Sequence, residues 1–253
     1  MARKKRNFLQ GETYFIRQEG HCGSVCFFDD ACYKVYLTRL ISCLSVYQVE
    51  LHSYVLLAGE IRLLMTPSTP SGISSLMQVV SGAYVQYFND RFERNGTLWK
   101  GRFKSSLIQG DELILNCHKY IELEPARLKL VSNPGTYQWS SYCINGFGGH
   151  GNGVTAHQCY DDFGALAVNR FQQYRDFVAE GFSSESHRLL EHQLSTGSAV
   201  CVNKPRVKAI RISMKSKGIK RNRKISKGSK SHQNPSPLRG ISAQESCQGI
   251  VKM

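Results

Sequence analysis

Two β-rich runs joined by a tight turn decide the fold: VELHSYVLL at residues 49–57, AGE at 58–60 and IRLLMT at 61–66. Branched, aliphatic and aromatic residues dominate both runs, as is typical of strands. Parallel strands need a crossover of a dozen or more residues, so a three-residue connection fits only an antiparallel hairpin. Glu60 and Arg62 are two residues apart and therefore share a face of the sheet.

The segments around this hairpin predict the rest of the fold. Asp111 is a candidate N-cap for the last helix, and Pro125 ends or kinks it. The order strand, helix, hairpin, helix, strand, helix predicts an α+β fold with a four-stranded antiparallel sheet covered by helices, of the ferredoxin-like or RRM-like kind. The flanking elements are expected as a strand at 13–18, helices at 30–46 and 71–88, a strand at 102–109 and a helix at 111–125.

Composition divides the chain into four parts. Glycine is frequent from Gly146 to Gly153, which favours a linker, and two short helices are expected beyond it, at 171–180 and 184–194. The predicted organisation is an α+β domain at 1–145, a Gly-rich linker at 146–153, a small helical accessory region at 154–203 and a disordered basic tail at 204–253.

The net charge of +14 is concentrated in the tail. Residues 204–253 contain 14 Lys and Arg against one acidic residue, Glu245. Such a tail has too few apolar residues to build a core, and nucleic acid is its expected partner because neutralised phosphates release counterions. The alternative is a solvated end that keeps the protein in solution. The tail cations assigned to DNA binding are Lys215, Lys217, Lys220, Arg221, Arg223 and Lys224.

The sequence predicts a cytoplasmic protein without a membrane partner. No apolar run is long enough to span a bilayer, and the charged N-terminus does not lead into a signal-peptide core. The nine cysteines form no paired framework, which favours reduced thiols. A zinc site from His21, Cys22, Cys26 and Cys32 is an alternative, although its spacing is loose and a second half is missing.

Four segments resemble the HUH single-tyrosine transposases of the REP-associated type, and their order and separations match as well. The resemblance covers roughly residues 1–215 and implies the same α+β fold. It also implies cleavage and rejoining of single-stranded DNA through a 5′-phosphotyrosine intermediate, as in DNA transposition and recombination. The segments are YVLLAGEIRLLMTP at 54–67, GTLWKGRFKSS at 96–106, YIELEPAR at 120–127 and YQWSSY at 137–142.

The resemblance places Tyr120 at the nucleophile position and three residues at metal-ligand positions. The family has histidine, an apolar residue and histidine where this chain has Glu60, Ile61 and Arg62, and it usually has an amide where this chain has Glu124. A phenol is a poor nucleophile at neutral pH, so the reaction needs a divalent cation. Mg²⁺ or Mn²⁺ would accept the two carboxylates if the site is active, and no cofactor is otherwise assigned.

Arg62 argues for a different use of these positions. A guanidinium has no lone pair to donate and pairs with carboxylates instead. We therefore expect Arg62 to bridge Glu60 or Glu124 and to replace the metal with an ion pair. A solvated pair of Glu60 and Arg62 on one strand face is the alternative.

Basic and aromatic residues alternate before and along the fourth strand, as is typical of surfaces that hold phosphates and stack bases. Trp99 and Phe103 are equally compatible with the core. His118 is a candidate base or substitute ligand because it precedes Tyr120 by two, whereas His52 and His157 fit packing or surface roles. The DNA-binding assignments in the body are Arg91, Arg94, Trp99, Lys100, Arg102, Lys104 and Arg127.

The sequence thus predicts a transposase-family protein that binds single-stranded or hairpin DNA, with three hypotheses for its activity. The first is a live strand transferase with a remodelled carboxylate site. The second is a binding-only descendant, motivated by Glu60 and Arg62 in place of both histidines. The third is a structural or interaction role in which the tail binds RNA or acidic partners.

Overall fold

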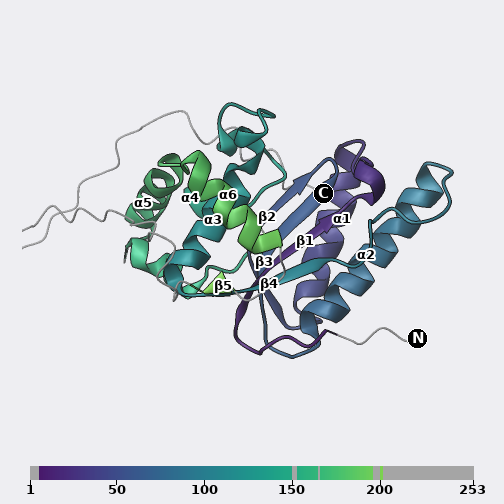
Figure 1. Cartoon of the computed structure of the whole chain (residues 1–253), viewed down its shortest axis with the longest axis horizontal. Coiled ribbons are helices and arrows are strands. Elements are labelled where there is room, and N and C mark those ends of the chain that lie inside the picture. The colour runs from purple at the N-terminus through teal and green to yellow at the C-terminus, as the bar shows by residue number, and fades with distance from the viewer. Residues whose placement is uncertain (1–5, 150–152, 165, 196–199, 202–253) are drawn as a thin grey trace, which may run out of the picture. The chain divides into compact units, whose positions relative to one another are not determined.

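The computed structural model describes residues 6–149, 153–164, 166–195 and 200–201 (Figure 1). These belong to the first of two units of the chain, residues 1–208, and the predicted tail at 204–253 lies outside them. The strands are β1 (Thr13–Glu19), β2 (Val49–Leu57), β3 (Glu60–Pro67), β4 (Lys104–Gln109) and β5 (Val200–Cys201). The helices are α1 (Asp30–Leu44), α2 (Gly72–Arg91), α3 (Asp111–Arg127), α4 (Tyr142–Phe147), α5 (Ala167–Ala179) and α6 (Ser184–Ser195), with short 3-10 turns at His21–Gly23, Pro134–Thr136 and Gln158–Phe163.

The sheet has the strand order β2-β3-β1-β4-β5. The first four strands are antiparallel, which confirms the predicted four-stranded α+β fold, and the hairpin turns at Ala58-Gly59. The two-residue strand β5 was not expected and pairs in parallel with the end of β4. β1 lies between β3 and β4, so that Arg17 pairs with Arg62 on one side and with Lys104 on the other. Paired residues share a face, so the register brings these three cations together.

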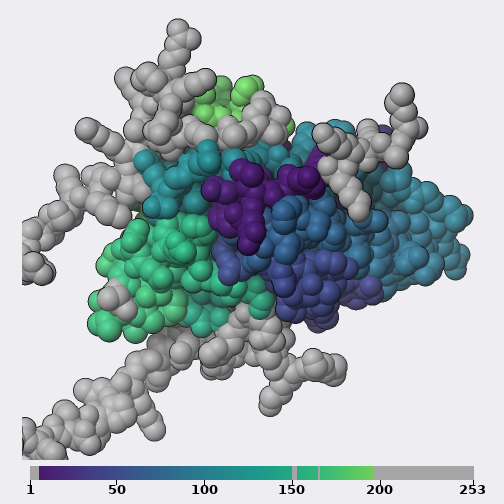
Figure 2. Space-filling model, turned by 90° about the horizontal axis from the view of Figure 1, so that it is seen from below, coloured from purple at the N-terminus to yellow at the C-terminus, as the bar shows by residue number. Residues whose placement is uncertain are grey.

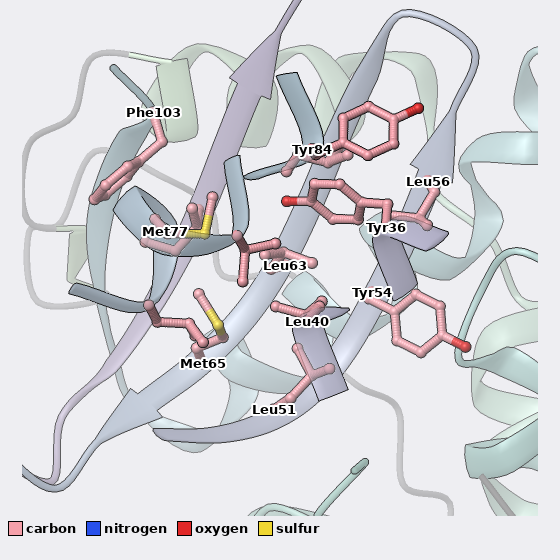
Figure 3. Close-up of a cluster of buried hydrophobic side chains, with 14 of the residues drawn as sticks. Tyr36, Leu40, Leu51, Tyr54, Leu56, Leu63, Met65, Met77, Tyr84 and Phe103 are labelled. Carbon is pink, nitrogen blue, oxygen red and sulfur yellow. The ribbon is translucent and has the colours of Figure 1, made fainter. Parts of the chain in front are cut away.

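One face of the sheet is covered by α1 and α2, and this layer is apolar (Figure 1). Tyr36 and Leu40 from α1, Leu63 from β3 and Tyr84 from α2 are fully buried, and their side chains point toward one another (Figure 3). Alternate residues of β3 reach this layer because side chains along a strand point to opposite faces. Burying such a side chain contributes about 1.5–3 kcal/mol each, so this layer is the main stabilising core.

The opposite face is covered by α3 (Figure 1). Its first residue is Asp111, and the N-cap is Gly110 rather than the predicted Asp111. Gly110 has φ 99°, a conformation that glycine adopts without strain, and the Asp111 carboxylate instead lies in the first turn, where it complements the helix dipole. Pro125 lies within the last turn, and the helix ends two residues later at Arg127.

The accessory helices α5 and α6 form as predicted and pack on this second layer. The Tyr174 hydroxyl of α5 donates to Glu122 of α3 at 2.6 Å, and the Lys119 ammonium of α3 lies 3.8 Å from the Phe177 ring centre. Helix α4 extends to Phe147, so the predicted linker begins as helix, and residues 150–152 lie outside the described chain. The domain boundaries proposed from the sequence remain predictions.

The N-terminal segment before β1 packs against the end of the sheet at which β1 begins and β3 ends. The Phe8 and Gly11 amides donate to the carbonyls of Pro70 and Pro67, at 3.0 and 2.9 Å. Figure 2 shows this purple segment lying on the blue surface that the hairpin and α2 contribute. The segment therefore fixes the start of β1 beside the end of β3.

The cysteines from Cys22 to Cys159 are free thiols, with Cys26 and Cys32 buried and Cys22 exposed. Within the described ranges no three His, Cys, Asp or Glu side chains are grouped to hold a metal ion, which does not support zinc at Cys22, Cys26 and Cys32. No helix among the residues described has the length and apolarity needed to cross a membrane.

Candidate functional site

Tyr120 lies in the middle of α3, on the side of the helix that faces the sheet. Its side chain is 2% exposed, and its ring lies between two partners from distant segments. The Arg62 guanidinium carbon is 4.8 Å from the ring centre, and the His187 ring of α6 is 5.1 Å away. Phe15 of β1 makes an edge contact at 6.0 Å. The candidate nucleophile is therefore a packed aromatic residue with a guanidinium over its ring.

Beside Tyr120, five side chains form alternating ion pairs, and we call them the Arg-Glu cluster: Arg17, Glu60, Arg62, Glu124 and Arg127. Arg62 donates through Nε to Glu60 Oε1 and through Nη2 to Glu124 Oε1, the latter at 2.9 Å. Arg17 donates to Glu60 Oε2, with N–O distances of 3.0 and 2.8 Å. Arg127 donates to Glu124 Oε2 at 2.7 Å and to Oε1 at 2.5 Å. Arg62 thus bridges both glutamates, which confirms the predicted ion pair.

The Arg-Glu cluster does not fit a divalent cation. Every carboxylate oxygen of Glu60 and Glu124 already accepts a hydrogen bond from an arginine. Arg62, 3% exposed, adds a positive charge between the two carboxylates. A metal would have to displace this guanidinium and would meet its charge, so a site for Mg²⁺ or Mn²⁺ is not formed by these residues.

Electrostatics in the site reflect burial and the arginines together. Burial raises the pKa of Glu124, but the hydrogen bond from Arg127 and the charge of Arg62 outweigh it, so the net pKa is lowered. Burial raises the pKa of Tyr120 to about 12, although Arg62 opposes the shift. The Tyr120 phenol is therefore harder to ionise than an ordinary tyrosine, which is unfavourable for a nucleophile.

A cavity of about 350 Å³ opens beside Tyr120, between α3 and α6. Arg127 and Arg188 supply cationic groups to its wall, and Phe182 and His187 supply rings. Burial lowers the pKa of His187, so the ring is neutral at pH 7 and adds no charge to the cavity. The cavity is large enough for a small ligand and brings solvent close to the Tyr120 side chain.

The residues assigned to DNA binding from the sequence are not all at one surface. Trp99 lies in the core, with the rings of Phe27, Tyr36 and Tyr84 at 6.4, 6.2 and 6.1 Å. Phe103 is buried as well, so neither aromatic ring is available for a base to stack on. Trp99 and Phe103 are therefore core residues, which was the alternative given from the sequence.

The assigned cations of the body lie in different parts of the structure. Arg91 pairs with Asp29 at 2.6 Å, and Arg94 lies 5.3 Å from the Phe88 ring centre. Arg127 belongs to the Arg-Glu cluster. Lys100, Arg102 and Lys104 are exposed and lie together at the start of β4. The tail cations Lys215, Lys217, Lys220, Arg221, Arg223 and Lys224 lie outside the described residues.

His118 does not serve Tyr120. It is two residues away on the helix and therefore projects to the other side, where its ring lies 6.3 Å from Tyr174. It is buried, and neither ring nitrogen has a hydrogen-bond partner in the described part of the chain. Burial lowers its pKa well below the ordinary value, so it is neutral. His52 and His157 join a separate chain of hydrogen bonds through Thr66 and Thr13.

Two residues of the site were not found from the sequence. Arg17 completes the Arg-Glu cluster from β1, and His187 reaches Tyr120 from α6. The pairing of β1 with β3 would have identified Arg17, since it lies opposite Arg62, but that register depends on long-range packing. His187 follows from the docking of α6, for which the sequence gives no signal.

Comparison with known proteins gives a fold likeness only. No protein-family model and no curated protein matches the sequence. A solved REP-associated tyrosine transposase bound to a REP hairpin is 15% identical, with a TM-score of 0.49 over 62% of this chain and 93% of that one. A bacterial tRNA(His) guanylyltransferase-like protein in complex with GTP is 10% identical, with a TM-score of 0.37 over 53% and 71%. The tRNA(His) guanylyltransferase of Saccharomyces cerevisiae is 11% identical, with a TM-score of 0.38 over 80% and 85%.

Proposed function

We propose that this chain is a transposase-type protein that binds single-stranded or hairpin DNA without cleaving it. One observation carries the proposal: Arg62 is buried between Glu60 and Glu124 and pairs with both. The positions that would hold a catalytic cation are thus filled by an internal ion-pair network. Without a cation, the described groups that could offset the repulsion between a Tyr120 phenolate and a phosphodiester are arginines, and Arg62 and Arg127 are already engaged by the carboxylates.

Charge supports the binding half of the proposal. The chain carries a net charge of +14, and the described body presents Lys100, Arg102 and Lys104 together on one exposed surface. Phosphate contacts by such cations give affinity without reading base sequence, so loss of cleavage chemistry does not remove binding. The protein would then act on DNA by occupancy rather than by strand transfer.

The test is incubation of the purified full chain with a labelled single-stranded hairpin oligonucleotide in Mn²⁺, Mg²⁺ or chelator. The control is Tyr120→Phe. We expect slower migration on native gels and no band that survives denaturation. Failure to bind the oligonucleotide at low salt would refute the proposal. A covalent band that Tyr120→Phe abolishes would also refute it, and its formation in chelator would mean that Arg62 supplies the charge a metal otherwise provides.

A double substitution, Glu60→His with Arg62→His, tests whether the site can cleave DNA once the ion pair is removed. It removes the bridging guanidinium and places two imidazoles on one strand face, where they can coordinate a divalent cation. We expect a metal-dependent covalent band if Tyr120 and the cavity beside it are otherwise positioned for cleavage. The matched control is the same double variant carrying Tyr120→Phe, which must show no band.

A further inference from the structure

A second concave site lies away from the Tyr120 cavity, between β1 and the loop that leads into β4. It encloses about 190 Å³, and we call it the β1–β4 groove. Four of the seven residues that line it are cations and one is a carboxylate. The lining residues are Arg17, Gln18, Glu19, Lys100, Gly101, Arg102 and Lys104.

Strand register creates the excess of positive charge. Arg17 pairs directly with Lys104 across β1 and β4, so both side chains leave the same face of the sheet. Like charges placed opposite one another on a sheet are unfavourable unless an anion or a counter-charge lies between them. Glu19 is the only carboxylate in the lining, and it is shared between Arg17 at 3.0 Å and Lys100 at 3.5 Å. Lys104 is exposed and forms no ion pair with any residue that the structure describes.

The groove is held in place by the core beneath it. The Lys100 amide donates to the Glu19 carbonyl at 2.9 Å, and Trp99 is anchored in the apolar layer. The buried Gln18 side chain donates to the Gly101 carbonyl at 3.4 Å and accepts from Ser81 at 2.8 Å. A Cβ at Gly101 would meet nothing within 4 Å, so the backbone there is open to solvent. Lys100, Arg102 and Lys104 are exposed on this wall, where an anion can reach them without a large rearrangement of the backbone.

We propose that the β1–β4 groove holds a backbone phosphate of the bound nucleic acid. This inference rests on the proposed function and assigns the place where the strand is held. Arg17 belongs to both the groove and the Arg-Glu cluster, since it also donates to Glu60. Nucleic acid bound in the groove therefore lies next to the Arg-Glu cluster, which adjoins Tyr120 of α3.

The test is acetylation of lysines in the full chain, with and without the single-stranded hairpin oligonucleotide, followed by mass spectrometry of each site. Lys34 is the internal control, because it is exposed on α1, which covers the opposite face of the sheet. We expect the oligonucleotide to reduce acetylation of Lys100 and Lys104 and to leave Lys34 unchanged. This readout is specific for each lysine, so contacts made elsewhere in the chain do not obscure it.

Three outcomes would contradict the assignment of a nucleic-acid phosphate to the β1–β4 groove. Binding of the oligonucleotide with unchanged acetylation at Lys100 and Lys104 removes the groove but leaves the proposed function standing. Absence of binding removes both. A third sample contains inorganic phosphate in place of the oligonucleotide, and protection of Lys100 and Lys104 in that sample alone would assign the groove to a free anion instead.

A salt titration gives a second, independent measure. A plot of log affinity against log salt concentration becomes less steep for each phosphate contact that is lost, by about 0.7 on a single strand and about 0.9 on a duplex stem. We expect that decrease for Lys104→Ala, measured by fluorescence anisotropy, and no decrease for the charge-matched Lys34→Ala. Equal slopes for the two variants would contradict the assignment.

Discussion

Glu122 and Glu124 lie two residues apart on α3 and are both buried, yet the two regions around them differ in charge. Within the described chain Glu122 accepts hydrogen bonds from uncharged groups: Ser141 at 2.6 Å, Asn145 at 2.7 Å, Tyr174 at 2.6 Å and Ser53 at 3.3 Å. Burial raises the pKa of Glu122, and these hydrogen bonds offset the shift only in part. Glu124 accepts from arginines, and its pKa is lowered. The same side chain on the same helix is thus destabilised as an anion in one region and stabilised in the other.

The hydrogen-bond partners place Glu122 in the packing between elements and Glu124 in the candidate site. Residues two apart on a helix project to different sides, so Glu122 joins β2, α4 and α5 whereas Glu124 faces the Tyr120 site. A neutral network around a buried carboxylate fixes neighbouring elements in one arrangement. The Arg-Glu cluster instead keeps alternating charges beside Tyr120.

The largest effect is expected from Glu122→Ala. The substitution leaves the buried Tyr174 hydroxyl without its acceptor, at about 1–3 kcal/mol, and leaves a cavity in the interior that adds to the loss. Ser141 and Asn145 lose the same acceptor but still reach the carbonyls of Tyr54 and His52. We expect the free energy of unfolding to fall by about 3–5 kcal/mol in urea denaturation at neutral pH. Glu122→Gln is the matched control, because its amide oxygen can accept and its amide nitrogen can donate to the Tyr174 hydroxyl. Equal losses for the two variants would show that the hydrogen bonds do not hold this region.

Arg62→Met tests the Arg-Glu cluster at a residue that is buried, as Glu122 is. Glu60 keeps Arg17 and Glu124 keeps Arg127, so neither carboxylate is left unpaired. We therefore expect a loss of about 1–3 kcal/mol, less than the loss for a buried pair reduced to one charge. Urea denaturation at low and high salt measures it. A loss as large as that of Glu122→Ala would mean that the remaining arginines do not compensate.

The opposite pKa shifts predict opposite pH dependence. The pKa of Glu122 is raised from 4.5, so its contribution to stability is present below that pH and is lost as pH rises through the folded-state pKa. The pKa of Glu124 is lowered from 4.5, so its contribution is present above that pH and is lost as pH falls through the folded-state pKa. Relative to wild type, Glu122→Gln should gain stability as pH rises, and Glu124→Gln should lose its disadvantage as pH falls. Unfolding free energies of both variants, measured at pH values below and above 4.5, test these expectations. Parallel curves of unfolding free energy against pH for the two variants would contradict the comparison.

The smallest effect is expected from Arg127→Ala. The Arg127 side chain is 44% exposed, so solvent screens much of its charge, and Arg62 still pairs with Glu124. We expect a loss of about 1 kcal/mol or less, which high salt should reduce further. Thermal unfolding at two salt concentrations checks this. An effect that is larger than that of Arg62→Met would place the main partner of Glu124 at the surface rather than in the interior.

Local patterns were sufficient for the elements and for part of the site. The two β-rich runs at 49–57 and 61–66 and the three-residue connection at 58–60 predicted the hairpin, and helical spacing predicted the helices that cover the sheet. The side-chain period of a strand placed Glu60 and Arg62 on one face, and the chemistry of guanidinium predicted their ion pair. The resemblance added Tyr120 and Glu124, which the fold brings to the same place.

Residues whose role depends on packing could not be identified in this way. Trp99 occurs among cations in the sequence, yet its ring is in the core, because burial of an aromatic side chain is decided by the layer beneath it. Asp111 has the chemistry of an N-cap, but the conformation of Gly110 starts the helix one residue earlier.

The sequence by itself determined the order of the main elements, the α+β class and the presence of Glu60 and Arg62 on one face of their strand. These features depend on periodicity and side-chain chemistry, which are local. The tertiary structure alone decided that Arg17 joins Glu60, that His187 lies against Tyr120 and that Glu122 and Glu124 titrate in opposite directions. Each of these depends on strand register, helix docking or burial, and such long-range contacts form only when distant segments are packed together.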